Sequence, residues 1–89
     1  TALSLKAKIY KNIGAVFLSW KNLNRALYYY QRSLSFAKLA DDHKTVADCY
    51  NNMGTVYEQQ HKYSQAIEFY NKALAFYKAQ QINERICIT

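Results

Sequence analysis

The sequence contains no proline and only two glycines among its 89 residues. This scarcity argues against a hairpin-rich β fold and against collagen-like repeats, and it excludes a glycine-rich phosphate-binding loop. Two cysteines are too few for a disulfide framework. The longest apolar runs are only a few residues long, so we expect neither a transmembrane helix nor a secretory signal. The remaining composition, 51% hydrophobic and 20% charged, is that of one small globular domain.

Acidic residues are absent from the first forty positions. Those positions hold seven Lys and Arg, whereas residues 41–80 hold four against five Asp and Glu. The net charge of +6 therefore comes from the N-terminal half of the chain. Such an asymmetry can steer an acidic partner, but scattered, solvated surface cations are the more ordinary reason for it.

The chain repeats itself with a period of forty residues. When Gly14 is aligned with Gly54, ten positions are identical in the two units. The identical pairs are Ala7/Ala47, Tyr10/Tyr50, Asn12/Asn52, Gly14/Gly54, Val16/Val56, Ala26/Ala66, Tyr30/Tyr70, Leu34/Leu74, Phe36/Phe76 and Lys38/Lys78. A fixed period of this length is typical of a solenoid.

Apolar residues within each unit follow helical spacing, as in Tyr10, Ile13 and Phe17. The pattern predicts an all-α fold with antiparallel helix–turn–helix units stacked into an α-solenoid. The expected helices span residues 3–20, 25–39, 43–60 and 65–80, and a fifth helix starts after Asn83. We expect Asn24 and Ser64 to cap the second and fourth helices. Asp41 and Asp42 open the third, next to the positive end of its dipole.

Each unit carries a recurrent set of small and aromatic residues. The first unit has Tyr10, Ile13-Gly14, Phe17, Ala26, Tyr30 and Ser33, and the second has Tyr50, Met53-Gly54, Tyr57, Ala66, Tyr70 and Ala73. This pattern resembles the tetratricopeptide repeat (TPR) family in a long-period form. The resemblance implies one repeat at 1–40, a second at 41–80 and the start of a third repeat's first helix at 81–89. The residues beyond the usual repeat length should extend the second helix and the loop that follows it.

In the TPR architecture the first helix of each repeat lines a concave groove. The resemblance places these peptide-binding residues in it: Lys8, Lys11, Asn12, Ala15, Ser19, Asp48, Asn51, Asn52, Thr55 and Gln59. Asn12 and Asn52 would form a ladder that holds the main chain of a ligand, and Lys8 and Lys11 would favour an acidic side chain or a C-terminal carboxylate. The alternative is that both asparagines are solvated or tie neighbouring helices together.

No pattern in the sequence indicates catalysis, a metal or a cofactor. Cys49 and Cys87 have no CxxC partner, so we expect buried free thiols, which suit an intracellular, cytoplasmic protein. The leading interpretation is a non-enzymatic protein-interaction module without a membrane role. A ligand-sensing segment of a larger regulator and an RNA-binding helical repeat are the alternatives. The expected partner is a protein or peptide of acidic character. Because the sequence begins with Thr1 and not with Met, we also expect it to belong to a longer chain whose neighbouring repeats contact it. In isolation the chain is expected to self-associate, to exchange helices or to be marginally stable, because about three stacked repeats are usually needed for stability.

Overall fold

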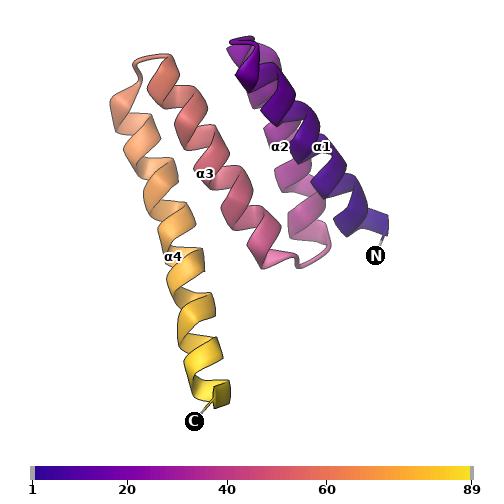
Figure 1. Cartoon of the computed structure of the whole chain (residues 1–89), viewed down its shortest axis with the longest axis vertical. Helices are drawn as coiled ribbons and strands as arrows, with labels where there is room; N and C mark the ends of the chain where they lie inside the picture. Colours follow the sequence, from indigo (N-terminus) through magenta and orange to yellow (C-terminus); the bar gives the residue numbers. More distant parts are fainter. Residues whose placement is uncertain (1, 89) are drawn as a thin grey trace.

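Four helices follow one another in the computed structural model, which describes the backbone of residues 2–88 and the side chains of residues 2–79. They are α1 (Ala2–Ser19), α2 (Leu23–Leu39), α3 (His43–Gln59) and α4 (Tyr63–Ile88). Helix α1 pairs with α2, α3 pairs with α4, and α2 joins the two pairs by packing on α3 (Figure 1). The described chain contains no strand, and the predicted all-α helical-repeat architecture is confirmed.

Three short turns connect the helices at residues 20–22, 40–42 and 60–62. The middle residue of each turn has a left-handed backbone: φ is 64° at Lys21, 53° at Asp41 and 64° at His61. None of the three is glycine, so each turn carries some backbone strain. Equivalent turns of the two repeats lie forty residues apart, and consecutive turns lie twenty apart.

The second and fourth helices begin two residues earlier than expected. Asn22, and not Asn24, caps α2, since its side chain accepts a hydrogen bond from the Arg25 backbone N–H at 3.4 Å. Ser64 is not a cap either, because α4 already includes Tyr63. The early start of α2 has a packing reason: Leu23 contacts the buried cluster around Ala26 and is in place only if the first turn is helical. Of the two aspartates expected to open the third helix, Asp42 is the cap, with Thr45 N–H donating to its Oδ1 at 3.2 Å, whereas Asp41 lies in the preceding turn.

Two helices of nearly equal length make up the first repeat, and the turns that follow them are equally short. Helix α1 has 18 residues and α2 has 17, and the turn after α2 is as short as the turn before it. The longer loop expected after the second helix is therefore not observed. Within the first repeat, two helices of nearly equal length lie antiparallel, which gives this part of the stack an even thickness.

Helix α4 runs without interruption from Tyr63 to Ile88 and extends past the other helices (Figure 1). A helix ending at residue 80 and a new one starting after Asn83 are therefore not observed. The segment contains neither glycine nor proline, so no residue in it breaks the helix. The assignment of residues 81–89 to a third repeat remains a prediction.

Small residues bring the paired helices close together. Ala7 and Ala26 are fully buried, and Gly14 lies directly against the ring of Tyr30. A Cβ atom at Gly14 would lie 2.9 Å from the Tyr30 ring, and one at Gly54 would lie 2.8 Å from the Tyr70 ring. In each repeat, the glycine therefore leaves space for a tyrosine ring of the paired helix to pack against its backbone.

Candidate peptide-binding surface

The first helices of the two repeats, α1 and α3, are in contact and carry the predicted groove residues. Exposed members of this set are Lys8, Asn12, Ala15, Ser19 and Asn51. Partly buried members are Lys11, Asp48, Asn52, Thr55 and Gln59. The part of the chain with described side chains has no enclosed pocket, so any ligand on these helices binds to an open surface.

Polar contacts join the N-terminal repeat to the C-terminal one across this surface. Lys11 Nζ lies 3.3 Å from Asp48 Oδ2 and forms an ion pair with it. At the two ends of the helices, Ser4 Oγ donates to Asp42 Oδ2 at 2.7 Å, and Lys21 Nζ donates to Gln59 Oε1 at 3.3 Å. Lys11 is therefore not a free cation for a ligand, because Asp48 already neutralises it.

Asp48 connects three helices. Besides its ion pair with α1, its Oδ1 accepts a 2.5 Å hydrogen bond from the Tyr77 hydroxyl on α4. Burial, and then the hydrogen bond to Asp48, raise the pKa of Tyr77 to about 12. The tyrosine stays a neutral donor at physiological pH, so Asp48 is held between one cation and one hydroxyl. Its role in this structure is to fix the two repeats relative to each other.

Thr55 is also engaged within the chain. Its hydroxyl donates to the Asn51 carbonyl oxygen at 3.2 Å and lies 3.1 Å from the Tyr70 hydroxyl. The Tyr70 hydroxyl donates to Glu58 Oε1 at 2.7 Å. Burial is the main cause that raises the pKa of Tyr70. These contacts attach α4 to the side of α3 that bears the predicted groove residues.

Asn12 and Asn52 stand apart from this network. Their side chains form no hydrogen bond to any residue whose side chain is described. They are equivalent residues of the two repeats, one on α1 and one on α3, and Asn12 is exposed while Asn52 is half-buried. Both amides are therefore available to an external group.

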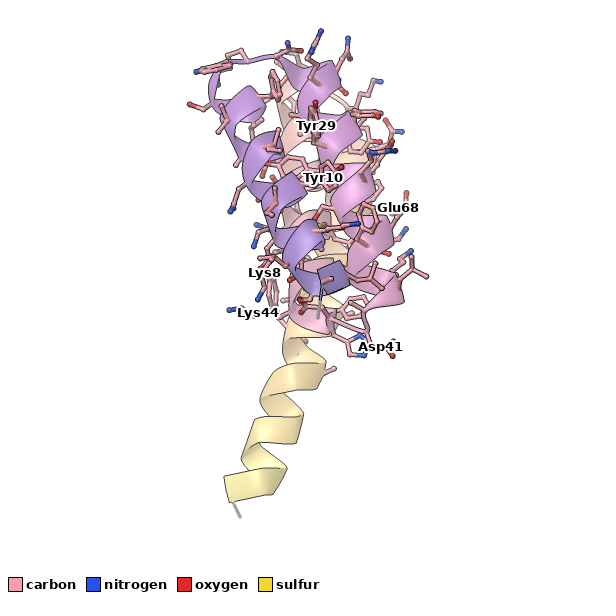
Figure 2. All side chains as sticks on the ribbon, turned by 90° about the vertical axis from the view of Figure 1, so that its right-hand side faces the viewer. Lys8, Tyr10, Tyr29, Asp41, Lys44 and Glu68 are labelled. Atoms are coloured by element: carbon pink, nitrogen blue, oxygen red, sulfur yellow. The ribbon has the colours of Figure 1, made fainter. Side chains whose placement is uncertain are left out.

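Cations border the same surface at one end. Lys8 and Lys44 are exposed and project from the same side of the bundle (Figure 2). Asp42 lies nearby with a lowered pKa, caused first by the hydrogen bonds from Ser4 and Thr45 and to a lesser degree by Lys8. Lys44 was not among the predicted residues. The forty-residue alignment equates it with Ser4, which gives no basis for expecting a cation there.

The thiol of Cys49 is buried inside the bundle, 3.1 Å from Ser33 Oγ. Burial raises its pKa, so it is a protonated packing group and not a nucleophile. Cys87 lies outside the residues with described side chains. Within those residues, no three His, Cys, Asp or Glu side chains gather closely enough to hold a metal ion. None of the helices in the described chain is sufficiently long and apolar to cross a membrane.

Stacked antiparallel helix pairs with glycine–tyrosine contacts repeated forty residues apart define a helical-repeat protein. The tetratricopeptide repeat family model matches residues 5–79, and the chain belongs to that family. A search of curated proteins gave no significant match. As a TPR protein, the chain is a protein-interaction repeat module, and its partner is a protein.

Proposed function

We propose that this protein binds an extended peptide segment along α1 and α3, and that Asn12 and Asn52 hydrogen-bond the main chain of that segment. The observation that carries the proposal is the contrast within the predicted groove. Lys11, Asp48 and Thr55 have partners inside the chain, whereas the two asparagines have none among the described residues. They are also the polar groove residues that are identical in both repeats.

Asparagine in a helix interior costs about 0.5 kcal/mol relative to alanine. Neither Asn12 nor Asn52 recovers that cost through a hydrogen bond to the described part of the protein. An amide side chain can both donate to and accept from a peptide bond, so each asparagine matches one peptide unit of an extended ligand. Two such contacts, one on each repeat, would hold the ligand across the helices without reading its side chains.

The expected charge of the ligand is inferred from the lysines on this surface that form no ion pair within the described part of the chain. Lys8 and Lys44 are exposed, whereas Lys11 can bind a ligand only by giving up Asp48. We therefore place an acidic side chain or a C-terminal carboxylate of the ligand near Lys8. This part of the recognition is electrostatic and partly exposed, so it should weaken as salt is raised. The asparagine contacts should depend much less on salt.

An extended-peptide array tested at two salt concentrations distinguishes these contributions. The protein is compared with an Asn12→Ala/Asn52→Ala variant and with Asn71→Ala, a matched control that removes an exposed asparagine from α4. We expect selective binding to the protein and to the control, and its loss in the double variant. Selective binding that survives the double substitution would refute the asparagine assignment. Absence of selective binding in the protein itself would refute peptide binding on this surface.

A further inference from the structure

Helix α1 exposes a row of apolar side chains that its counterpart in the second repeat buries. We call Leu5, Ile9 and Val16 the N-terminal face. Val16 is 46% exposed and Ile9 is 48% exposed, whereas Val56 and Cys49, which occupy the equivalent positions of α3, are fully buried at 0%. In α3 these positions are covered by the first repeat, and Cys49 lies against Ser33 of α2. The N-terminal face is therefore equivalent to the part of α3 that forms the contact between the two repeats, but in this structure it is exposed.

Helix α4 exposes the complementary half. We call Tyr63, Ile67 and Leu74 the C-terminal face; Ile67 is 59% exposed and Leu74 is 48% exposed. Their equivalents on α2 are the three leucines at positions 23, 27 and 34. Those leucines pack against a buried cluster that includes Met53 and Val56 of α3. The same side of the second helix thus covers the following repeat in the case of α2 and is exposed in the case of α4.

We propose that two copies of this protein associate head to tail, with the C-terminal face of one copy packed on the N-terminal face of the next. The contact would repeat the geometry by which α2 already covers α3. Each face would then be covered by the face of another copy, and the contact between α2 and α3 within one chain shows how the two surfaces fit. This interaction is separate from peptide binding, since Asn12 and Asn52 belong to neither face.

An aromatic contact supports this pairing. Within the chain, Tyr50 lies near two cations: Lys72 of its own repeat at 5.6 Å from the ring centroid, and Lys38 of the preceding repeat at 5.8 Å. The equivalent Tyr10 has only the cation of its own repeat, Arg32, at 6.0 Å among the residues with described side chains. Tyr10 lies between α1 and α2 on the side of the molecule seen in Figure 2. In the head-to-tail pair, the exposed Lys78 of the other copy supplies the second cation.

Charge favours head-to-tail pairing over contact between two N-terminal faces. Residues 1–40 carry seven cations and no acid, so two such repeats in contact would repel each other. The second repeat, residues 41–80, is nearly neutral with four cations and five acids. Because the two faces of the proposed contact differ, each added copy leaves one face free, and the assembly grows with concentration without closing.

Sedimentation velocity over a concentration series tests the proposal. The protein should pass from the 10.4 kDa monomer to species of two or more copies as its concentration rises. Ile9→Glu and Ile67→Glu should each stay monomeric, because each lacks one of the two faces. The control Leu39→Glu changes an exposed residue outside both faces and should associate like the unmodified protein. Circular dichroism verifies that each variant is folded. If Ile9→Glu does not fold, Val16→Glu is used in its place, and if Ile67→Glu does not fold, Leu74→Glu is used.

Mixing the two variants gives the sharper test. The Ile9→Glu chain keeps its C-terminal face and the Ile67→Glu chain keeps its N-terminal face. An equimolar mixture should therefore form a pair at twice the monomer mass and nothing larger. Association of either variant alone, a mixture that remains monomeric, or an unmodified protein that is monomeric at all concentrations would each overturn the proposal.

Discussion

Alanine at Gly14 should destabilise the protein, whereas alanine at Gly54 should leave its stability nearly unchanged. Both substitutions replace a glycine in the interior of a helix with alanine. This replacement by itself stabilises a helix by about 1 kcal/mol. Both also place a Cβ atom within 3 Å of a tyrosine ring, 2.9 Å from Tyr30 in the first case and 2.8 Å from Tyr70 in the second. The outcomes differ because the two rings differ in their freedom to move.

Tyr30 is fully enclosed, so its ring cannot withdraw from the new methyl group. Overpacking of this kind costs about 1–3 kcal/mol. Subtracting the helix-propensity gain leaves a net loss of about 1 kcal/mol for Gly14→Ala. Tyr70 is only half-buried, and its hydroxyl is bonded to the exposed Glu58, which can follow a tilt of the ring. The propensity gain therefore offsets most of the strain in Gly54→Ala.

Urea and thermal unfolding followed by circular dichroism measure this difference. A loss of about 1 kcal/mol lowers the Tm of a domain this small by about 4–8 °C. Ala15→Gly, at an exposed site of α1, calibrates the helix-propensity term and should cost about 1 kcal/mol. If Gly54→Ala were as unstable as Gly14→Ala, or less stable, the argument from ring mobility would be wrong.

Two further predictions concern pH. Asp42→Ala should lower the free energy of unfolding by about 1 kcal/mol through loss of the α3 cap, while Asp42→Asn should keep most of that free energy. Because its hydrogen bonds hold the folded pKa of Asp42 below the ordinary value of 3.8, its contribution is present above that pH. The stabilisation by Asp42 should therefore decrease as the pH falls, which urea unfolding at a series of pH values measures. A difference between the protein and Asp42→Ala that does not change with pH would contradict the role of Asp42 as the cap. Burial raises the pKa of Tyr30 from 10.0 to about 12, so stability should fall between pH 10 and 12. Tyr77, whose pKa is also raised to about 12, contributes to the same decline. Tyr30→Phe should therefore make the decline less steep without removing it, and a decline of the same steepness in the variant would show that Tyr30 does not contribute.

The repeat architecture was predictable because the positions of the apolar residues in the sequence show both the helical spacing and the fixed period. The starts of the helices were less predictable. Asn22 and Asn24 are equally good caps, and the choice depends on Leu23, whose burial is visible only once the helices are packed. The left-handed turn residues gave no signal, since Lys21 and His61 occupy positions where glycine would be expected.

The helices that carry the candidate site were predictable, but the contacts on them were not. The helix period placed Lys11 on the first helix of its repeat, yet it could not show that Asp48, 37 residues later, takes up its charge. The same limit applies to Tyr77, whose hydroxyl reaches Asp48 from the last helix. Contacts between repeats depend on the relative rotation of two helix pairs, and no local pattern encodes that rotation.

The even spacing of the turns makes the chain extensible in units. Each helix-and-turn segment occupies twenty residues and ends in the same left-handed geometry, so residues 3–42 begin and end at equivalent points of the backbone. A duplicate of this segment inserted between Asp42 and His43 would keep every later helix in register. In that longer chain Ile9 and Val16 of the duplicate would lie against α2, in the places now held by Cys49 and Val56. A gene with one such duplication would encode a longer rod without any newly designed interface.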